Sequence, residues 1–203
     1  MNKNERVLSI DPSIAKCAFV VWENDSPHYW GVFKSGGIES KKKLKSVTYF
    51  HNEIDKIDFI SDSLINIVEE YQITQIVMEG LALNAVGNAT RTLSGLYYVL
   101  LSKLKSLGFT EPENIKVIPP TQVKSQARLL LENEGNIETI DSKGKKKVAK
   151  IKMDKSVMIG VAEQHWPQVL QGYKNSGEMA GKEDLSDACL IYNAYKQLNE
   201  FLG

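Results

Sequence analysis

The stretch Val7-Leu8-Ser9-Ile10-Asp11 is a short apolar run that ends in a carboxylate. Such a run is typical of a buried β-strand, and it places Asp11 at the carboxyl end of that strand. A second run, Ile73 to Met78, has the same character and is followed by Glu79. In layered α/β sheets, functional side chains gather at the carboxyl ends of strands. The sequence therefore predicts that Asp11 and Glu79 belong to one site.

Two more acids stand near the C-terminus, at the start of an apolar helix. Asp184 and Asp187 are three residues apart, so they share one face of that helix. Glu183 also shares a face with Asp187, and the choice between Glu183 and Asp184 stays open. Converging buried carboxylates are costly unless a cation compensates them. All-oxygen ligands suit Mg²⁺ or Mn²⁺ rather than zinc, so these acids predict a magnesium site.

Length and composition indicate an ordinary globular protein. The 203 residues allow one domain with ample core, and we expect a single domain over 1–203 with an inserted basic hairpin at about 132–152. No apolar run reaches membrane-spanning length, and no signal-peptide pattern is present. The two cysteines, Cys17 and Cys189, favour thiols in a reducing compartment. We therefore expect a cytoplasmic protein with no membrane partner.

Charge is balanced in sum but uneven along the chain. Lys plus Arg equal Asp plus Glu at 25 each, so net charge favours neither nucleic acid nor any other partner. Basic residues nevertheless cluster at Lys41 to Lys45 and from Lys143 to Lys155, whereas acids collect between Glu53 and Glu70. Such runs are commonly solvated faces, and two of them beside a carboxylate site also suit a phosphate backbone.

The apolar patterns predict an α/β layer with an antiparallel edge and a parallel half. Asp154 is expected to cap one helix, and Thr121 another that runs to about Leu131. The polar stretch 137–150 is expected to form a hairpin around a tight turn at 141–144. The expected strands are 6–11, 16–22, 28–34, 73–78 and 115–118, and the other expected helices are 48–71, 88–107 and 183–201.

Five motifs in this order resemble those of RuvC-type Holliday-junction resolvases, over roughly residues 6 to 200. Ser9-Ile10-Asp11-Pro12-Ser13 resembles the first-strand motif, and Ile76 to Gly80 resembles the second acidic strand. Thr121 to Lys124 and Asp154 to Ser156 resemble two basic segments, and Asp184 to Ala188 resembles the closing acidic helix. Gly87-Asn88-Ala89-Thr90-Arg91 resembles a stretch found in the RuvC-like endonucleases of bacteriophages.

The resemblance implies a ribonuclease-H-like fold, with a mixed sheet of three antiparallel strands plus parallel strands flanked by helices. It implies a Mg²⁺-dependent endonuclease that acts as a homodimer on four-way DNA junctions in a bacterial cell, where a phage could encode it. By motif position, Asp11, Glu79, Asp184 and Asp187 would be metal ligands. Lys124 and Lys155 would bind phosphate or stabilise the transition state.

Phosphodiester hydrolysis by two metal ions gives each acid an expected role. Asp11 would bridge both ions, Glu79 and Asp187 would each bind one, and Asp184 would assist. Two alternatives share these residues: a ribonuclease H that cuts RNA–DNA hybrids, and a branched-DNA-binding protein without catalysis. Acids that face phosphate without a metal would weaken binding, which counts against the last. The apolar helix 88–107 is the expected dimer interface, because its apolar residues cover more than one face.

Overall fold

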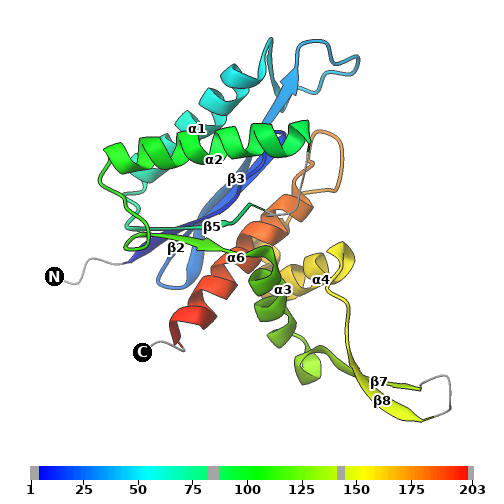
Figure 1. The fold of residues 1–203 in the computed structure, drawn as a ribbon. Helices are drawn as coiled ribbons and strands as arrows, with labels where there is room; N and C mark the ends of the chain where they lie inside the picture. The colour runs from blue at the N-terminus through cyan, green and yellow to red at the C-terminus, as the bar shows by residue number, and fades with distance from the viewer. Residues whose placement is uncertain (1–4, 82–86, 141–144, 201–203) are drawn as a thin grey trace.

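A six-stranded mixed sheet forms the centre of the molecule (Figure 1), in a computed structural model that describes residues 5–81, 87–140 and 145–200. The strand order is β4-β3-β2-β1-β5-β6. β1, β2 and β3 pair antiparallel, whereas β5 and β6 run parallel to β1. The strands are β1 (Arg6–Asp11), β2 (Lys16–Glu23), β3 (Ser26–Gly37), β4 (Thr48–Phe50), β5 (Gln75–Glu79) and β6 (Ile115–Ile118).

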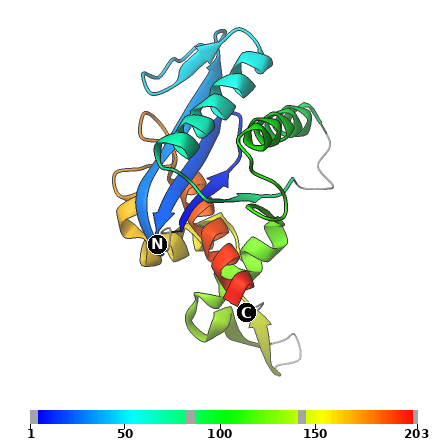
Figure 2. The same cartoon turned by 90° about the vertical axis from the view of Figure 1, so that its left-hand side faces the viewer.

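Helices cover both faces of this sheet (Figures 1 and 2). One face packs against α1 (Glu53–Glu70) and α2 (Asn88–Ser106). The other packs against α3 (Pro120–Leu129), α4 (Lys155–His165), the short α5 (Pro167–Leu170) and α6 (Lys182–Glu200). The predicted α/β class, with its antiparallel and parallel halves, is confirmed.

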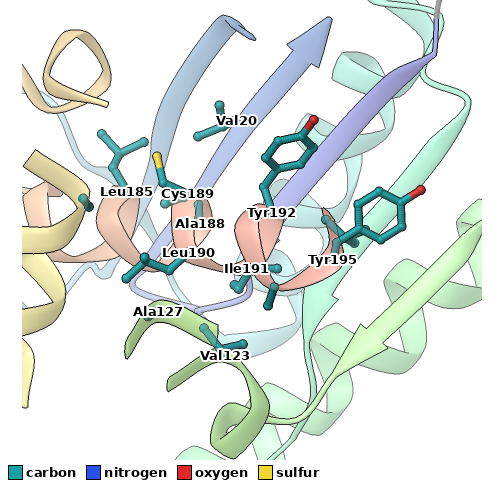
Figure 3. Packing of buried hydrophobic residues seen from close by; sticks show 14 of the residues in the cluster. Val20, Val123, Ala127, Leu185, Ala188, Cys189, Leu190, Ile191, Tyr192 and Tyr195 are labelled. Carbon is teal, nitrogen blue, oxygen red and sulfur yellow. The ribbon is translucent and has the colours of Figure 1, made fainter. Parts of the chain in front are cut away.

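Alternation along β1 divides the core into two layers. Leu8 and Ile10 pack toward α1 and α2, whereas Val7 packs toward α6. Successive side chains of a strand point to opposite faces, so the two layers follow directly from the sequence of β1. Figure 3 shows the α6 layer, where Leu185, Ala188 and Ile191 pack with residues of β2 and α3.

Aromatic stacking fixes α6 against the sheet, and one hydrogen bond within the sheet orients the stacked Trp22 ring. The rings of Trp22 on β2 and Tyr192 on α6 are stacked, with centroids 3.9 Å apart. Trp22 Nε1 also donates a 2.8 Å hydrogen bond to Ser9 Oγ, which satisfies two polar groups that are otherwise buried. The helix that carries Asp184 and Asp187 is therefore held firmly against the central strands.

Two predicted helix starts are wrong. The helix expected from residue 48 begins at Glu53, because Asn52 is its N-cap and its side chain accepts a hydrogen bond from the Asp55 N–H. Residues 48–50 instead form β4 at the sheet edge. Thr121 does not cap α3: Pro119 occupies the N-cap, and Pro120 begins the helix, where a missing N–H costs nothing.

The polar segment before α4 forms the predicted hairpin. β7 (Asn136–Ile140) and β8 (Lys146–Lys150) pair antiparallel after the 3₁₀ turn η1 (Glu132–Gly135). The expected turn at 141–144 lies outside the described residues. Asp154 caps α4 as predicted, since its carboxylate accepts hydrogen bonds from the N–H groups of Ser156 and Val157.

The cysteines and the helices agree with the expectations for a globular protein with free thiols. Cys17 and Cys189 are free and buried, as expected for cysteines that pack as small apolar side chains. Among the described helices, none combines the length and apolar character that crossing a bilayer requires.

Candidate active site

Strand register brings the first two predicted acids together. β1 and β5 are parallel neighbours, with Ile10 opposite Met78, so Asp11 and Glu79 end adjacent strands side by side. Asp11 stands two residues beyond Ser9, and Glu79 two beyond Val77, which lies in the α6 layer. Both carboxylates therefore point to the face of the sheet that α6 covers.

The first turn of α6 brings two more acids to the same place. Gly181 precedes the helix with φ +138°, a conformation that favours glycine and turns the chain toward the sheet. Leu185 and Ala188 are fully buried against the strands, which turns the neighbouring Asp184 and Asp187 toward the strand ends. The helix thus aims both predicted acids at Asp11 and Glu79.

Electrostatics shows that the four acids act on one another. Burial raises the pKa of Asp11 well above its ordinary value, and the charges of Asp187, Glu79 and Asp184 raise it further. Burial raises the pKa of Asp187 to about 7, with added repulsion from Glu79, Glu183 and Asp184. Burial likewise raises the pKa of Glu79. A buried cluster of this kind lowers its free energy when it gains a positive charge.

Asp184 and Glu183 differ in where their carboxylates go. Asp184 Oδ2 is buried and has no hydrogen-bond partner among the described residues, although Lys16 Nζ lies 3.2 Å from it in an ion pair. Glu183 is more exposed and pairs instead with Lys155. The carboxylate of Asp184 is therefore held inside the cluster by Lys16, whereas the carboxylate of Glu183 is paired with Lys155 at the rim.

Both predicted lysines lie at the rim of the acids. Lys124 on α3 acts on Glu79, because its positive charge opposes the effect of burial on the pKa of that carboxyl. Lys155 opens α4, and its hydrogen bond to Glu183 raises the pKa of the lysine. The structure therefore brings all six predicted site residues into one neighbourhood.

Two lysines that sequence reasoning missed also border the acids. Lys16 on β2 and Lys34 on β3 are partners across the two strands, and Lys16 forms the ion pair with Asp184. Lys34 is almost fully buried and donates a 2.7 Å hydrogen bond to the backbone oxygen of Glu178. Their one sequence signal is a lysine at the end of an otherwise apolar strand, which is too common to single them out.

The loop before α6 is tied to the basic cluster near residue 43. The carboxylate of Glu178 accepts hydrogen bonds from the N–H groups of Lys45 (2.8 Å) and Ser46 (2.9 Å). Ser46 Oγ also donates to the Glu178 backbone oxygen. We call these contacts the Glu178 clamp. It places the lysine-rich loop 41–45 beside the segment that leads into the acidic turn of α6.

The donor set fits a hard divalent cation in its chemistry. It offers four carboxylates, and burial raises the pKa values of three of them, Asp11, Glu79 and Asp187. Within the described ranges, no three His, Cys, Asp or Glu side chains stand close enough together to hold a metal ion already.

Comparison with solved structures shows which known fold this is. The chain is similar to Thermus thermophilus RuvC in complex with a Holliday junction substrate, with a TM-score of 0.59 and 11% identity over 97% of this chain and 96% of that one. Another Thermus thermophilus RuvC structure gives a TM-score of 0.58 at 11% identity, again covering 97% and 96%. The yeast mitochondrial Holliday junction resolvase Ydc2 is more distant, with a TM-score of 0.49 and 17% identity over 98% of this chain and 82% of that one.

Sequence comparison adds no closer relative. No protein-family model matches the chain, and no curated protein matches it. The likeness to the two Thermus structures extends over nearly the whole of both chains. The chain therefore has the ribonuclease-H-like fold of the RuvC-type Holliday junction resolvases.

Proposed function

We propose that this protein is a metal-dependent endonuclease that resolves four-way DNA junctions by symmetric phosphodiester hydrolysis. One observation carries the proposal: Asp11, Glu79, Asp184 and Asp187 converge at the carboxyl ends of β1 and β5, and burial and mutual repulsion raise the pKa values of Asp11 and Asp187. Strongly perturbed pKa values are concentrated at functional sites, and a bound cation would offset the repulsion within this cluster. The fold shared with Thermus thermophilus RuvC supports the choice of substrate.

Two Mg²⁺ ions, or Mn²⁺ in their place, are the cofactors that the acids would hold. When bound, such ions supply an activated water and offset the negative charge that develops on the phosphate and the leaving oxygen. Asp11, Glu79 and Asp187 would hold the ions, and Asp184 would assist.

Lysines would position the DNA backbone around this cluster. Lys124 and Lys155 lie at its rim and would bind oxygens of the phosphate to be cut. Lys155 is paired with Glu183 in the free protein, so a phosphate would compete for the lysine with that carboxylate. Lys16 would keep its ion pair with Asp184 and thereby orient that acid.

Symmetric cleavage of a four-way junction calls for two active sites related by a twofold axis, so a homodimer suits the substrate. The outer side of α2 is our proposed interface. Tyr98 is 67% exposed there, and a partner copy would cover it. We place the protein in the cytoplasm of a bacterial cell, encoded by the bacterium or by a phage that infects it.

A cleavage assay with four substrates tests the proposal. A four-way junction, a fork, a linear duplex and an RNA–DNA hybrid are each incubated with the protein in Mg²⁺, and the nicked strands are mapped. We expect paired nicks at symmetric positions of the junction, and little cutting of the duplex. Cutting of the hybrid alone would identify a ribonuclease H instead, and tight junction binding without any cutting would identify a binding protein.

An isosteric variant separates chemistry from binding. Asp11→Asn removes a proposed ligand and a negative charge with little change of shape, so it should abolish cleavage and leave metal-free junction binding unchanged or tighter. Asp62→Asn is the matched control, because it removes an aspartate on α1 that is 64% exposed. Cleavage by Asp11→Asn at close to the wild-type rate would show that Asp11 holds no catalytic metal.

A further inference from the structure

The β7–β8 hairpin extends away from the rest of the molecule. Figures 1 and 2 show it leaving the α3 and α4 side and projecting beyond the sheet and its helices. Its side chains add little to the core: Ile137 is 44% exposed and Val148 is 65% exposed. Apolar burial therefore contributes little to the stability of this hairpin, and burial does not account for its presence.

The base of the hairpin is nevertheless firmly anchored. The Ile151 N–H donates a 2.8 Å hydrogen bond to the Gly135 carbonyl, which closes the two strands where they leave the body. Gly135 is buried with φ +68°, and a Cβ there would lie 2.7 Å from Arg128 Cγ, so only glycine fits. Met153 is buried in the core next to this base. The hairpin therefore projects from a base that is held in place by the body of the protein.

Positive charge is the chemical character of this hairpin. β8 contributes Lys146, Lys147 and Lys150. Glu138 on β7 is the one acidic residue within the two described strands. Lys146 pairs with Glu138 at 3.2 Å, and both side chains are more than 70% exposed. In the described part of the chain, neither Lys147 nor Lys150 forms an ion pair. The register puts Lys146 and Lys150 on one face and Lys147 on the other.

The anchored end of the hairpin leads straight to the active site. Lys155 stands only five positions after Lys150, and its ammonium pairs with Glu183 beside the acids. A chain of that length spans at most about 18 Å, and the nine residues back to Lys146 span at most about 32 Å. Base pairs along duplex DNA are about 3.4 Å apart. The lysines can therefore reach phosphates up to about ten base pairs from the cut.

We propose that the β7–β8 hairpin binds the phosphate backbone of a duplex arm of the DNA substrate, within about ten base pairs of the cleaved bond. The inference rests on the proposed function, and it assigns a role to a segment that the catalytic site does not use. The exposed lysines of β8 suit the negatively charged phosphate backbone of a duplex. The contact would add affinity and orientation without sequence specificity.

Salt dependence of binding is the direct test. Junction affinity is measured in EDTA across a series of salt concentrations, for wild type and for the triple variant Lys146→Ala, Lys147→Ala, Lys150→Ala. We expect weaker binding, and a slope of log affinity against log salt that is flatter by up to about 0.9 for each lost contact. The control replaces Lys116, which lies near the start of β6, at the end of the parallel strands opposite to the acids, and should keep the wild-type slope.

A variant that is expected to tighten binding tests whether weaker binding by the triple variant reflects misfolding. Glu138→Gln frees Lys146 and removes the one acid from the described strands, so it should tighten binding and steepen the slope. Circular dichroism should be the same for all four proteins, because exposed lysines contribute little to stability.

Neutral DNA linkages locate the contact. Methylphosphonates replace the phosphates of one arm between about three and ten base pairs from the cut, within the reach set by the chain. Wild type should lose affinity for this junction, whereas the triple variant should bind both junctions equally. An unchanged slope in the triple variant, with normal wild-type binding, would refute the hairpin contact alone. Failure of wild type to bind or cut any junction would refute the proposed function and this inference together.

Discussion

Replacing Asp187 by Asn should make the metal-free protein more stable while it destroys the proposed activity. Burial and three neighbouring acids raise the pKa of Asp187 from 3.8 to about 7. That difference of about three pKa units corresponds to a cost of up to about 4 kcal/mol for keeping the carboxylate ionised in the folded state. Asparagine has nearly the same shape and carries no charge, so the variant avoids this cost.

The pH window of the effect follows from the direction of the pKa difference. Below about pH 4 the carboxyl is protonated in both the folded and the unfolded chain, so its charge costs nothing. Between about pH 4 and 7 the Asp187 carboxyl ionises in the unfolded chain but stays largely protonated in the folded one. The free energy of unfolding of wild type therefore falls as pH rises. Above about pH 7 the full cost is present. The advantage of Asp187→Asn should therefore be small at pH 4 and largest at pH 8.

Urea denaturation in EDTA at pH 4.5 and pH 8 measures the effect. We expect Asp187→Asn to exceed wild type by about 2–4 kcal/mol at pH 8 and by much less at pH 4.5. Asp62→Asn on α1 is the control and should stay within about 0.5 kcal/mol of wild type at both values. Added Mg²⁺ should stabilise wild type more than the variant, because it binds only the folded site. Equal stability of Asp187→Asn and wild type at pH 8 would refute the inference that ionised Asp187 destabilises the folded protein.

Three further changes test other parts of the structure. Glu178→Ala breaks the Glu178 clamp, so hydrogen exchange at Lys45 and Ser46 should accelerate and the KM for junction DNA should rise more than kcat falls; unchanged exchange would contradict the clamp. Leu64→Ala opens a cavity in a fully buried position of α1 and should cost about 2–5 kcal/mol by urea denaturation. Asn52→Ala removes the cap of α1 and should cost about 1 kcal/mol in the same measurement, and a cost near zero would mean that water replaces the cap.

Sequence predicted the parts of the site that depend on local pattern. Asp11 and Glu79 each follow an apolar run, and parallel strands bring such positions to one edge of a sheet. Asp184 and Asp187 follow from helical spacing alone. The hairpin and the Asp154 cap are likewise short-range features, and the structure confirms both.

The missed features depend on contacts between distant segments. Lys16 and Lys34 become neighbours through the register of β2 and β3, which no single stretch encodes. The Glu178 clamp joins residues more than 130 positions apart. Thr121 has good capping chemistry, but two prolines before it already fix the backbone of the first turn, so α3 begins two residues earlier than a Thr121 cap would place it. Metal binding, dimerisation and the DNA substrate stay predictions.

The division of the acids between the sheet and α6 also matters while the chain is being made. Asp11 and Glu79 are translated early, whereas α6 is the last element of the described fold. The ribosome adds about 5–20 residues per second, so the roughly one hundred residues between Glu79 and Asp184 take about 5–20 s. During that interval the growing chain holds only two of the four acids of the candidate site. A nuclease assembled in this way would be harmless to nearby DNA until its final helix docks.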